Sequence, residues 1–208
     1  MVVGALAVVA LAASWACGSE EASNTSVPTP RPTPTPFDAS RVEFERATGA
    51  FESYTIDVPA GWTVEDTRFA GGFGQEFVLN HDGTRVAAIM VHCRVGTTIE
   101  SMMDQDQKVV HGVHGTYIKA SAVQVVVAGL PARQLDYNAA LAGIPVNYRS
   151  VYLSREPCGW RLALATFGAG LFEQYLPFFE RAVASFEPKS FEVPFSDRDP
   201  FSGAGTLE

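Results

Sequence analysis

QEFVLNHDGTRVAAIMVHC, residues 75–93, is typical of a β-hairpin. Two extended runs, Gln75–Leu79 and Val86–Cys93, flank the tripeptide His81-Asp82-Gly83. Asp-Gly between two such runs is the strongest short-range hairpin signal that a sequence can contain. We therefore predict an antiparallel hairpin in the middle of the chain.

The same period-two alternation continues on both sides of this hairpin. Ser53–Val58 and Trp62–Thr67 flank the turn residues Pro59-Ala60-Gly61, so they are expected to form a first hairpin. Four later runs have the length and composition of antiparallel strands. They are Tyr117–Ala128, Ala132–Tyr137, Val146–Ser154 and Gly159–Phe167.

Two segments instead have apolar residues at helical spacing. The first begins after Thr97 or Thr98, which are candidate N-caps, and ends at Gly112 or Gly115. The second, Leu171–Phe186, has a wide stripe of aromatic and aliphatic residues. Short strands followed by helices in this order predict an α+β domain, with an antiparallel sheet flanked by helices.

The front of the chain has the order of a bacterial lipoprotein precursor. An apolar run and the step Ser14-Trp15-Ala16 precede Cys17. We predict that residues 1–17 are a signal peptide ending at this lipidation cysteine, so that palmitate or a similar acyl chain anchors the protein at the extracytoplasmic face of the cell membrane. Ser14 and Ala16 also suit ordinary signal peptidase, which leaves simple secretion as the alternative.

Two segments lack the apolar residues that a packed core requires. Residues 18–36 are rich in Pro and Thr and are expected to form an extended, disordered linker. Residues 188–208 lose all periodicity and are expected to form a flexible tail. The globular domain predicted between them, 37–187, has the length of one domain.

Charge and cysteine content limit the class of partner and the compartment. A formal net charge of −8 argues against binding to nucleic acid or to an anionic bilayer, since both are themselves negative. We therefore expect membrane contact through the lipid anchor and an envelope protein as partner. Cys93 and Cys158 lie on different predicted strands, so an oxidising compartment would allow a disulfide between them.

The histidines are the natural place to look for a metal site. His111 and His114 are three residues apart, and a strand containing His92 and Cys93 could approach them. Glycines beside both imidazoles favour a helix end at which they are solvated. We therefore predict no metal site and no cofactor.

Other candidate groups have structural explanations. Glu100, Asp104 and Asp106 are expected on a solvated helix face, because they lack the glycine and terminal glutamate of a calcium loop. The glycine-rich segment 70–74 lacks the Gly-Lys-Ser/Thr of a phosphate loop and is expected to connect two strands. No serine or cysteine lies in a nucleophile motif. We therefore predict no catalytic residue and no enzymatic activity.

Three motifs resemble those of the PsbP-like α/β/α sandwich family. They are YTIDVPAGW at 54–62, Gly129-Leu130-Pro131-Ala132 before a strand, and a final helix that closes in Ala184-Ser185-Phe186. The family includes a photosystem II extrinsic subunit, a Ran-binding nuclear import factor and many bacterial lipoproteins of uncharacterised role. The resemblance implies the fold and a binding or assembly role, and it assigns no functional residue.

These observations predict a non-catalytic, lipid-anchored envelope protein that acts as an interaction or assembly module. The alternative is an extracytoplasmic carrier of a small molecule or metal. Its pocket would lie between the sheet and the Leu171–Phe186 helix.

Overall fold

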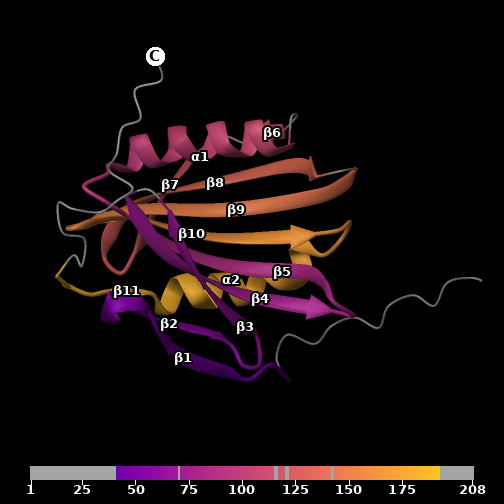
Figure 1. The fold of residues 1–208 in the computed structure, drawn as a ribbon, viewed down its shortest axis with the longest axis horizontal. Coiled ribbons are helices and arrows are strands. Elements are labelled where there is room, and N and C mark those ends of the chain that lie inside the picture. Colours follow the sequence, from indigo (N-terminus) through magenta and orange to yellow (C-terminus); the bar gives the residue numbers. More distant parts are fainter. Residues whose placement is uncertain (1–40, 70, 115–116, 120–121, 142, 193–208) are drawn as a thin grey trace, which may run out of the picture. The chain divides into compact units, whose positions relative to one another are not determined.

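The structure, a computed structural model, describes residues 41–69, 71–114, 117–119, 122–141 and 143–192. The predicted signal peptide and linker, and most of the predicted tail, lie outside these residues. Within them the chain forms a large sheet, a small sheet and two α-helices, shown in Figure 1.

The large sheet contains eight strands that pair in antiparallel fashion throughout. They are β3 (Thr63–Phe69), β4 (Gly72–His81), β5 (Thr84–Val95), β6 (Tyr117–Lys119), β7 (Val123–Val127), β8 (Leu130–Leu141), β9 (Ile144–Arg155) and β10 (Cys158–Phe167). Their spatial order is β3-β4-β5-β10-β9-β8-β6, and β7 also pairs with β8.

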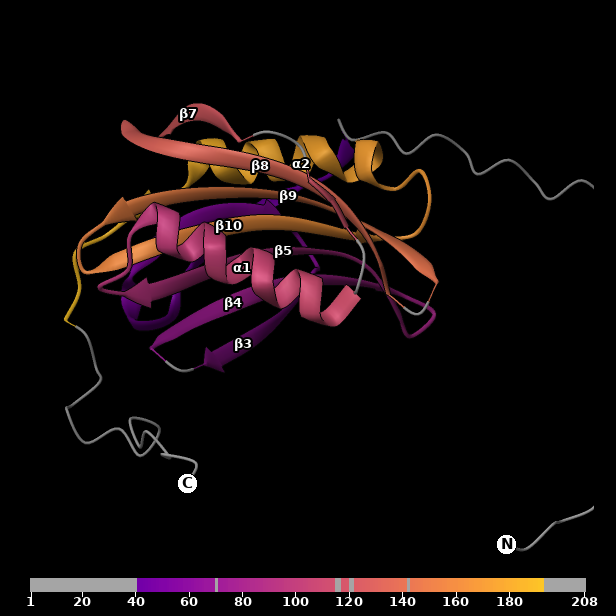
Figure 2. The ribbon, with the colours of Figure 1, turned by 90° about the horizontal axis from the view of Figure 1, so that it is seen from above.

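The small sheet and the helices complete the layers. The small sheet has the order β1-β2-β11, formed by Phe44–Thr48, Tyr54–Pro59 and Glu187–Pro188, and a short 3₁₀ turn covers Ala50–Glu52. Helix α1 (Ile99–His114) runs obliquely across one face of the large sheet, as Figure 2 shows. Helix α2 (Phe172–Ser185) and the small sheet cover the other face. This arrangement confirms the predicted α+β sandwich.

The hairpin predicted from residues 75–93 is present as β4 and β5. Asp82 and Gly83 have φ of 50° and 74°, as a tight turn between twisted strands requires. The register shifts from Leu79 opposite Ala87 to Asn80 opposite Arg85, so one extra residue, Val86, forms a bulge in β5.

The first predicted hairpin is wrong, because its two strands belong to different sheets. β2 pairs with β1 and β11, whereas β3 pairs with β4. The turn after Pro59, in which Gly61 has φ of 79°, takes the chain from one sheet to the other. Alternation identifies a strand but not its partner, so the local pattern could not separate these two arrangements.

The glycine-rich segment was expected to connect two strands, but Gly72, Phe73 and Gly74 belong to a strand. β4 begins at Gly72 and includes Phe73 and Gly74. A Cβ at Gly72 would collide with the Cys93 carbonyl oxygen, and one at Gly74 would collide with the His92 ring. These glycines therefore permit the close approach of β4 to β5.

The first residues of the predicted tail are docked on the domain. Glu187–Pro188 pair with β2, and the Lys189 amide donates a hydrogen bond of 2.7 Å to the Ser53 carbonyl. The Phe191 ring lies edge-on to Phe73, with 5.6 Å between centroids. The boundary of the folded domain therefore extends beyond residue 187.

The main core lies between the large sheet and the α2 layer, and it is rich in aromatic side chains. Tyr54, Trp160 and Phe186 are fully buried, and their ring centroids are 5.5 to 5.6 Å apart. Edge-on and tilted contacts of this kind add to the free energy gained from burial alone.

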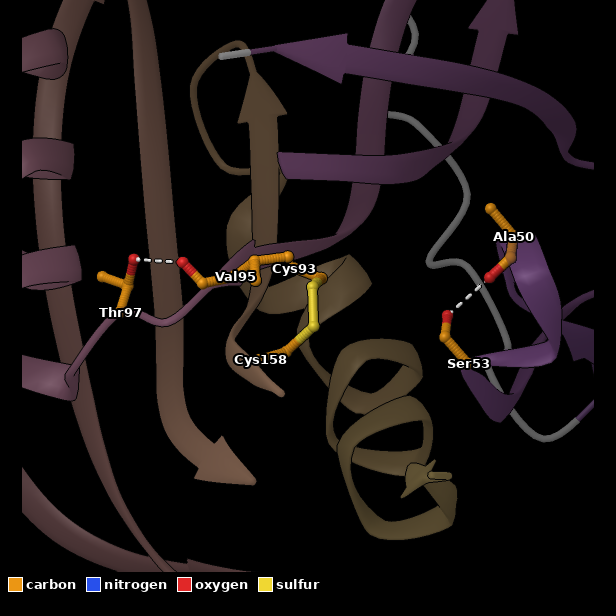
Figure 3. Close-up of a disulfide and its surroundings, with 6 residues drawn as sticks. All are labelled: Ala50, Ser53, Cys93, Val95, Thr97 and Cys158. Atoms are coloured by element: carbon orange, nitrogen blue, oxygen red, sulfur yellow. Dashed lines mark hydrogen bonds between the residues drawn. A yellow bond between two sulfur atoms is a disulfide. The ribbon is translucent and has the colours of Figure 1, made fainter. Parts of the chain in front are cut away.

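A disulfide joins Cys93 of β5 to Cys158 of β10 within this core, as Figure 3 shows. Their Cα atoms are 5.4 Å apart, and both side chains are buried. The structure thus pairs the two cysteines that the sequence analysis proposed. Just beyond it, Thr97 Oγ1 donates a hydrogen bond to the Val95 carbonyl where the chain leaves β5 for α1.

Helix α1 begins close to where it was predicted. The Ser101 amide donates to Thr98 Oγ1 at 3.2 Å, which identifies Thr98 as the N-terminal cap.

Within the described residues, neither helix is both long enough and apolar enough to cross a membrane.

Candidate binding site beside helix α1

Arg161 is a charged residue within a strand that is otherwise almost wholly apolar. β10 reads CGWRLALATF, and its alternate side chains face opposite sides of the sheet. Trp160 and Leu162 belong to the aromatic core, so Arg161 lies on the face that α1 covers. Its side chain is 12% exposed. A charge buried to this extent needs a partner within the protein.

Asp106 of α1 provides that partner. Its Oδ2 atom lies 3.1 Å from Arg161 Nε and accepts hydrogen bonds from the hydroxyls of Tyr152 and Tyr137. Arg161 Nη2 also donates to Tyr137 Oη at 3.1 Å. These four side chains, which we call the Arg161 network, connect α1 to β8, β9 and β10.

Three members of the network, Tyr137, Tyr152 and Arg161, have pKa values raised above their ordinary values. Burial raises the pKa of Tyr137 to about 12, with Arg161 opposing the shift and Asp106 adding to it. The pKa of Tyr152 is raised by the same causes. Burial lowers the pKa of Arg161, but Asp106 and the two tyrosines raise it more, so it stays well above its ordinary value. The guanidinium and both phenols therefore keep their protons.

His92 lies beside Arg161 as its cross-strand partner on β5. Its ring packs edge-on against Phe69, and its Nε2 atom is buried with no hydrogen-bond partner in the described part of the chain. Burial, together with the positive charges of Arg161 and Arg94, lowers the pKa of His92 to about 3. The imidazole is therefore neutral at physiological pH. The absence of a side chain at Gly74, opposite on β4, leaves room for the ring.

A hollow of about 170 Å³ opens between α1 and this part of the sheet. The Arg94 guanidinium lies over the Phe69 ring, 4.9 Å from its centroid. Within the residues that the structure describes, the Arg94 side chain makes no hydrogen bond or ion pair. Phe69, Met102 and Val109 form the apolar walls, whereas His92, Arg94, Asp106 and Arg161 form the polar lining.

The sequence also offered Cys17, His111 and His114 as candidates. Cys17 lies outside the described residues. His111 and His114 belong to the last turn of α1, and their side chains also lie outside the description. Among the side chains that are described, no three from His, Cys, Asp and Glu gather in a way that could hold a metal ion.

The acidic side chains in the first turns of α1 differ in their exposure to solvent. Glu100 is exposed, and Asp104 is an exposed partner of Lys108 at 2.6 Å, as a solvated face predicts. Asp106 contradicts that prediction, because its side chain is 14% exposed and turned toward the sheet. The sequence did contain a signal for the buried position of Asp106, namely the single arginine, Arg161, within an apolar strand. A buried cation requires an anion from a neighbouring element.

Two further grooves lie on either side of β7. One, of about 460 Å³, is lined by the start of α1 and by β7 and β8, and the other, of about 260 Å³, by β7, β8, β9 and α2. A carrier pocket was predicted between the sheet and α2. The inner face of that helix is filled by Tyr175, Phe178 and Phe179, so the groove lies at its rim.

Comparison with known proteins supports the fold. A scan against protein-family models and a search of curated protein sequences gave no match. Among solved structures, the cyanobacterial PsbP of Synechocystis, CyanoP, aligns over 71% of this chain and 94% of its own, with a TM-score of 0.53 and 13% identity. The fold is PsbP-like.

Two other solved structures align over a similar part of the chain. The Ran-binding protein Mog1p of Saccharomyces cerevisiae covers 71% of this chain and 96% of its own, with 8% identity and a TM-score of 0.49. LpqN of Mycobacterium tuberculosis, described as involved in cell envelope biogenesis, covers 71% and 92%, with 10% identity and a TM-score of 0.44. At identities of 8% to 13%, these likenesses assign no role to any side chain of the hollow.

Proposed function

We propose that this protein is a non-catalytic, lipid-anchored binding module of the cell envelope, and that it engages an envelope protein through the hollow beside α1. The observation that carries the proposal is the contrast between two arginines. Arg161 forms an ion pair with Asp106 and a hydrogen bond with Tyr137, whereas Arg94 lines the same hollow and makes neither kind of contact with the described residues. Rigid polar groups beside one unpaired charge suit recognition better than proton transfer.

The disulfide supports an extracytoplasmic location. Cytoplasmic reductants keep most thiols reduced, so a buried Cys93–Cys158 pair in the core is typical of a protein that folds outside the cytoplasm. The signal-like order of segments before Cys17 points to the same compartment.

The anchor is tested by labelling cells with a radioactive fatty acid. We expect label in the wild-type protein and none after Cys17→Ala, with the variant released from the membrane fraction. Equal labelling of both proteins, or no labelling of either, would refute anchoring at this residue.

The binding surface is tested by capture from envelope extracts with the tagged full-length chain. Val109 is 57% exposed at the wall of the hollow, so Val109→Trp places an indole over the hollow without altering the core. Val64→Trp is the matched control, because Val64 is 51% exposed on β3 and does not line the hollow. A specific partner should be lost with the first variant and kept with the second. Loss with both, or with neither, would contradict the proposal.

A second candidate function is transport or storage of a small molecule. It is favoured by the 460 Å³ groove between α1 and β7, which falls within the size range of small-molecule sites. Native mass spectrometry of the protein purified from its host tests it. A stoichiometric bound molecule that is lost after Val126→Glu would support a carrier, and its absence would favour the interaction module.

A further inference from the structure

We infer that the hollow beside α1 binds a carboxylate attached to a small apolar group. This inference rests on the proposed function in treating the hollow as the binding surface, and it adds the chemical class of the ligand.

The charges lining the hollow favour a single negative charge. Arg94 and Arg161 supply two guanidinium groups, whereas Asp106 supplies one carboxylate, so one positive charge is in excess. This local excess is opposite in sign to the formal net charge of the whole chain, which is −8. Glu76 approaches His92 to 3.9 Å, but it is paired with Arg85 at 2.8 Å and does not line the hollow.

The orientation of Arg94 suits a planar acid. Its guanidinium lies over the Phe69 ring, which restricts its rotamers before a ligand arrives. Guanidinium groups bind carboxylates through two parallel hydrogen bonds, and a pre-oriented donor loses less entropy in doing so. The buried Nε2 of His92 adds a polar atom to the same lining and has no partner among the described residues.

Asp106 makes a doubly charged ligand unfavourable. A phosphate group brings close to two negative charges at neutral pH. Its second charge would face the Asp106 carboxylate, which is held in place by Tyr137 and Tyr152. A monocarboxylate balances the single excess charge and avoids this repulsion.

The size and walls of the hollow limit the apolar part. A cavity of about 150 Å³ accommodates a molecule as large as benzene. The hollow, at about 170 Å³, has Phe69, Met102 and Val109 as walls. One phenyl ring, or an aliphatic group of that size, therefore fits beside the guanidinium.

The test is calorimetric titration of the purified full-length chain with benzoate at pH 7 and fixed salt concentration. Benzamide has the same shape without the charge, and benzylamine has the opposite charge. We expect benzoate to bind at least tenfold more tightly than either. No measurable benzoate binding, or equal affinity for benzoate and benzamide, would overturn the inference.

Two arginine variants assign the binding to the hollow. Arg94→Gln should weaken benzoate binding at least tenfold and leave benzamide unchanged. Arg68→Gln is the control, because Arg68 is exposed and neighbours Phe69 on β3 but points to the opposite face of the sheet. Equal affinity of wild type and Arg94→Gln would refute the assignment. If Arg94→Gln failed to fold, loss of benzoate binding in Val109→Trp would decide the same question.

The source of the carboxylate is distinguished with a peptide. Gly-Gly-Phe with a free C-terminus is compared with its amide and with benzoate. Tighter binding of the free peptide indicates the C-terminus of a partner protein, whereas tighter binding of benzoate indicates a free organic acid. If no probe binds but Val109→Trp abolishes partner capture, the ligand class is wrong and the proposed function stands. If benzoate binds but no envelope protein is captured, the ligand class is supported and the proposed function is wrong.

Discussion

Asp106 is the residue whose removal should disturb the α1 side of the sheet most. It lies beside a buried guanidinium and accepts two phenolic hydrogen bonds. A buried ion pair contributes little net stability compared with an apolar pair, but removing one partner leaves the other charge buried and uncompensated. The strongest effects of mutation on this face therefore belong to the Arg161 network.

Asp106→Asn should lower the free energy of unfolding by about 3–5 kcal/mol, because Arg161 would keep its charge without a counter-ion. Asp104→Asn provides the control in the same helix. Its exposed pair with Lys108 should contribute less than about 1 kcal/mol. Urea denaturation of both variants measures the difference, and similar losses in the two would show that Asp106 does not compensate Arg161.

The lowered pKa of His92 predicts how the free energy of unfolding depends on pH. Its pKa is about 3 in the folded protein, against an ordinary value of 6.5, so between these values the unfolded chain binds more protons than the folded one. The stability associated with the neutral imidazole is thus complete above pH 6.5 and is lost as the pH falls toward 3. The slope for one proton approaches ~1.4 kcal/mol per pH unit.

The measurement is the free energy of unfolding from pH 7 to pH 4 for wild type, His92→Gln and His81→Gln. His81 is 82% exposed near the β4–β5 turn, so its variant should keep the wild-type slope. The His92→Gln slope should be shallower, since the groups around the ring, Arg94, Arg161 and Glu76, remain in place. An unchanged slope would show that the imidazole binds a proton as readily in the folded protein as in the unfolded chain.

At the scale of elements, the disulfide connects the two central strands of the large sheet. Cys93 and Cys158 are separated by 65 residues, and β5 and β10 pair along most of their length. Closing a long loop restricts the unfolded chain, which stabilises the folded one.

Replacing both cysteines with alanine should therefore lower the free energy of unfolding by about 2–4 kcal/mol while the fold is kept. Thermal unfolding of the double variant measures this loss, and the wild-type protein with a reductant should lose a similar amount. A double variant as stable as the oxidised wild type would contradict the stabilising role of the bond.

Local sequence predicted the elements better than their partners. The β4–β5 hairpin followed from Asp82-Gly83, and both helices followed from apolar spacing. The separation of β2 from β3 into two sheets could not be predicted, because it depends on which face of the large sheet the small sheet covers. The docking of Phe191 on Phe73 and Trp160 was missed for a similar reason, since the residues around it show no periodicity.

At the scale of the whole domain, the two faces of the large sheet differ in chemistry. The α2 face is closed by aromatic side chains, whereas the α1 face holds a charged network and an open hollow. The hollow takes its lining from β3, β5, β10 and α1, which are distant in sequence. Only the strand order places Arg94 and Arg161 together, so sequence analysis could recognise the fold but not the site.

Binding of an envelope partner at the hollow beside α1 is the proposal on which the other functional inferences depend. It is tested most directly by photo-crosslinking in living cells, with a photoreactive amino acid at position 109 or, as control, at position 64 of the full-length chain. We expect a discrete crosslinked protein from position 109 and none from position 64. The same adducts from both positions, or none from position 109, would contradict it.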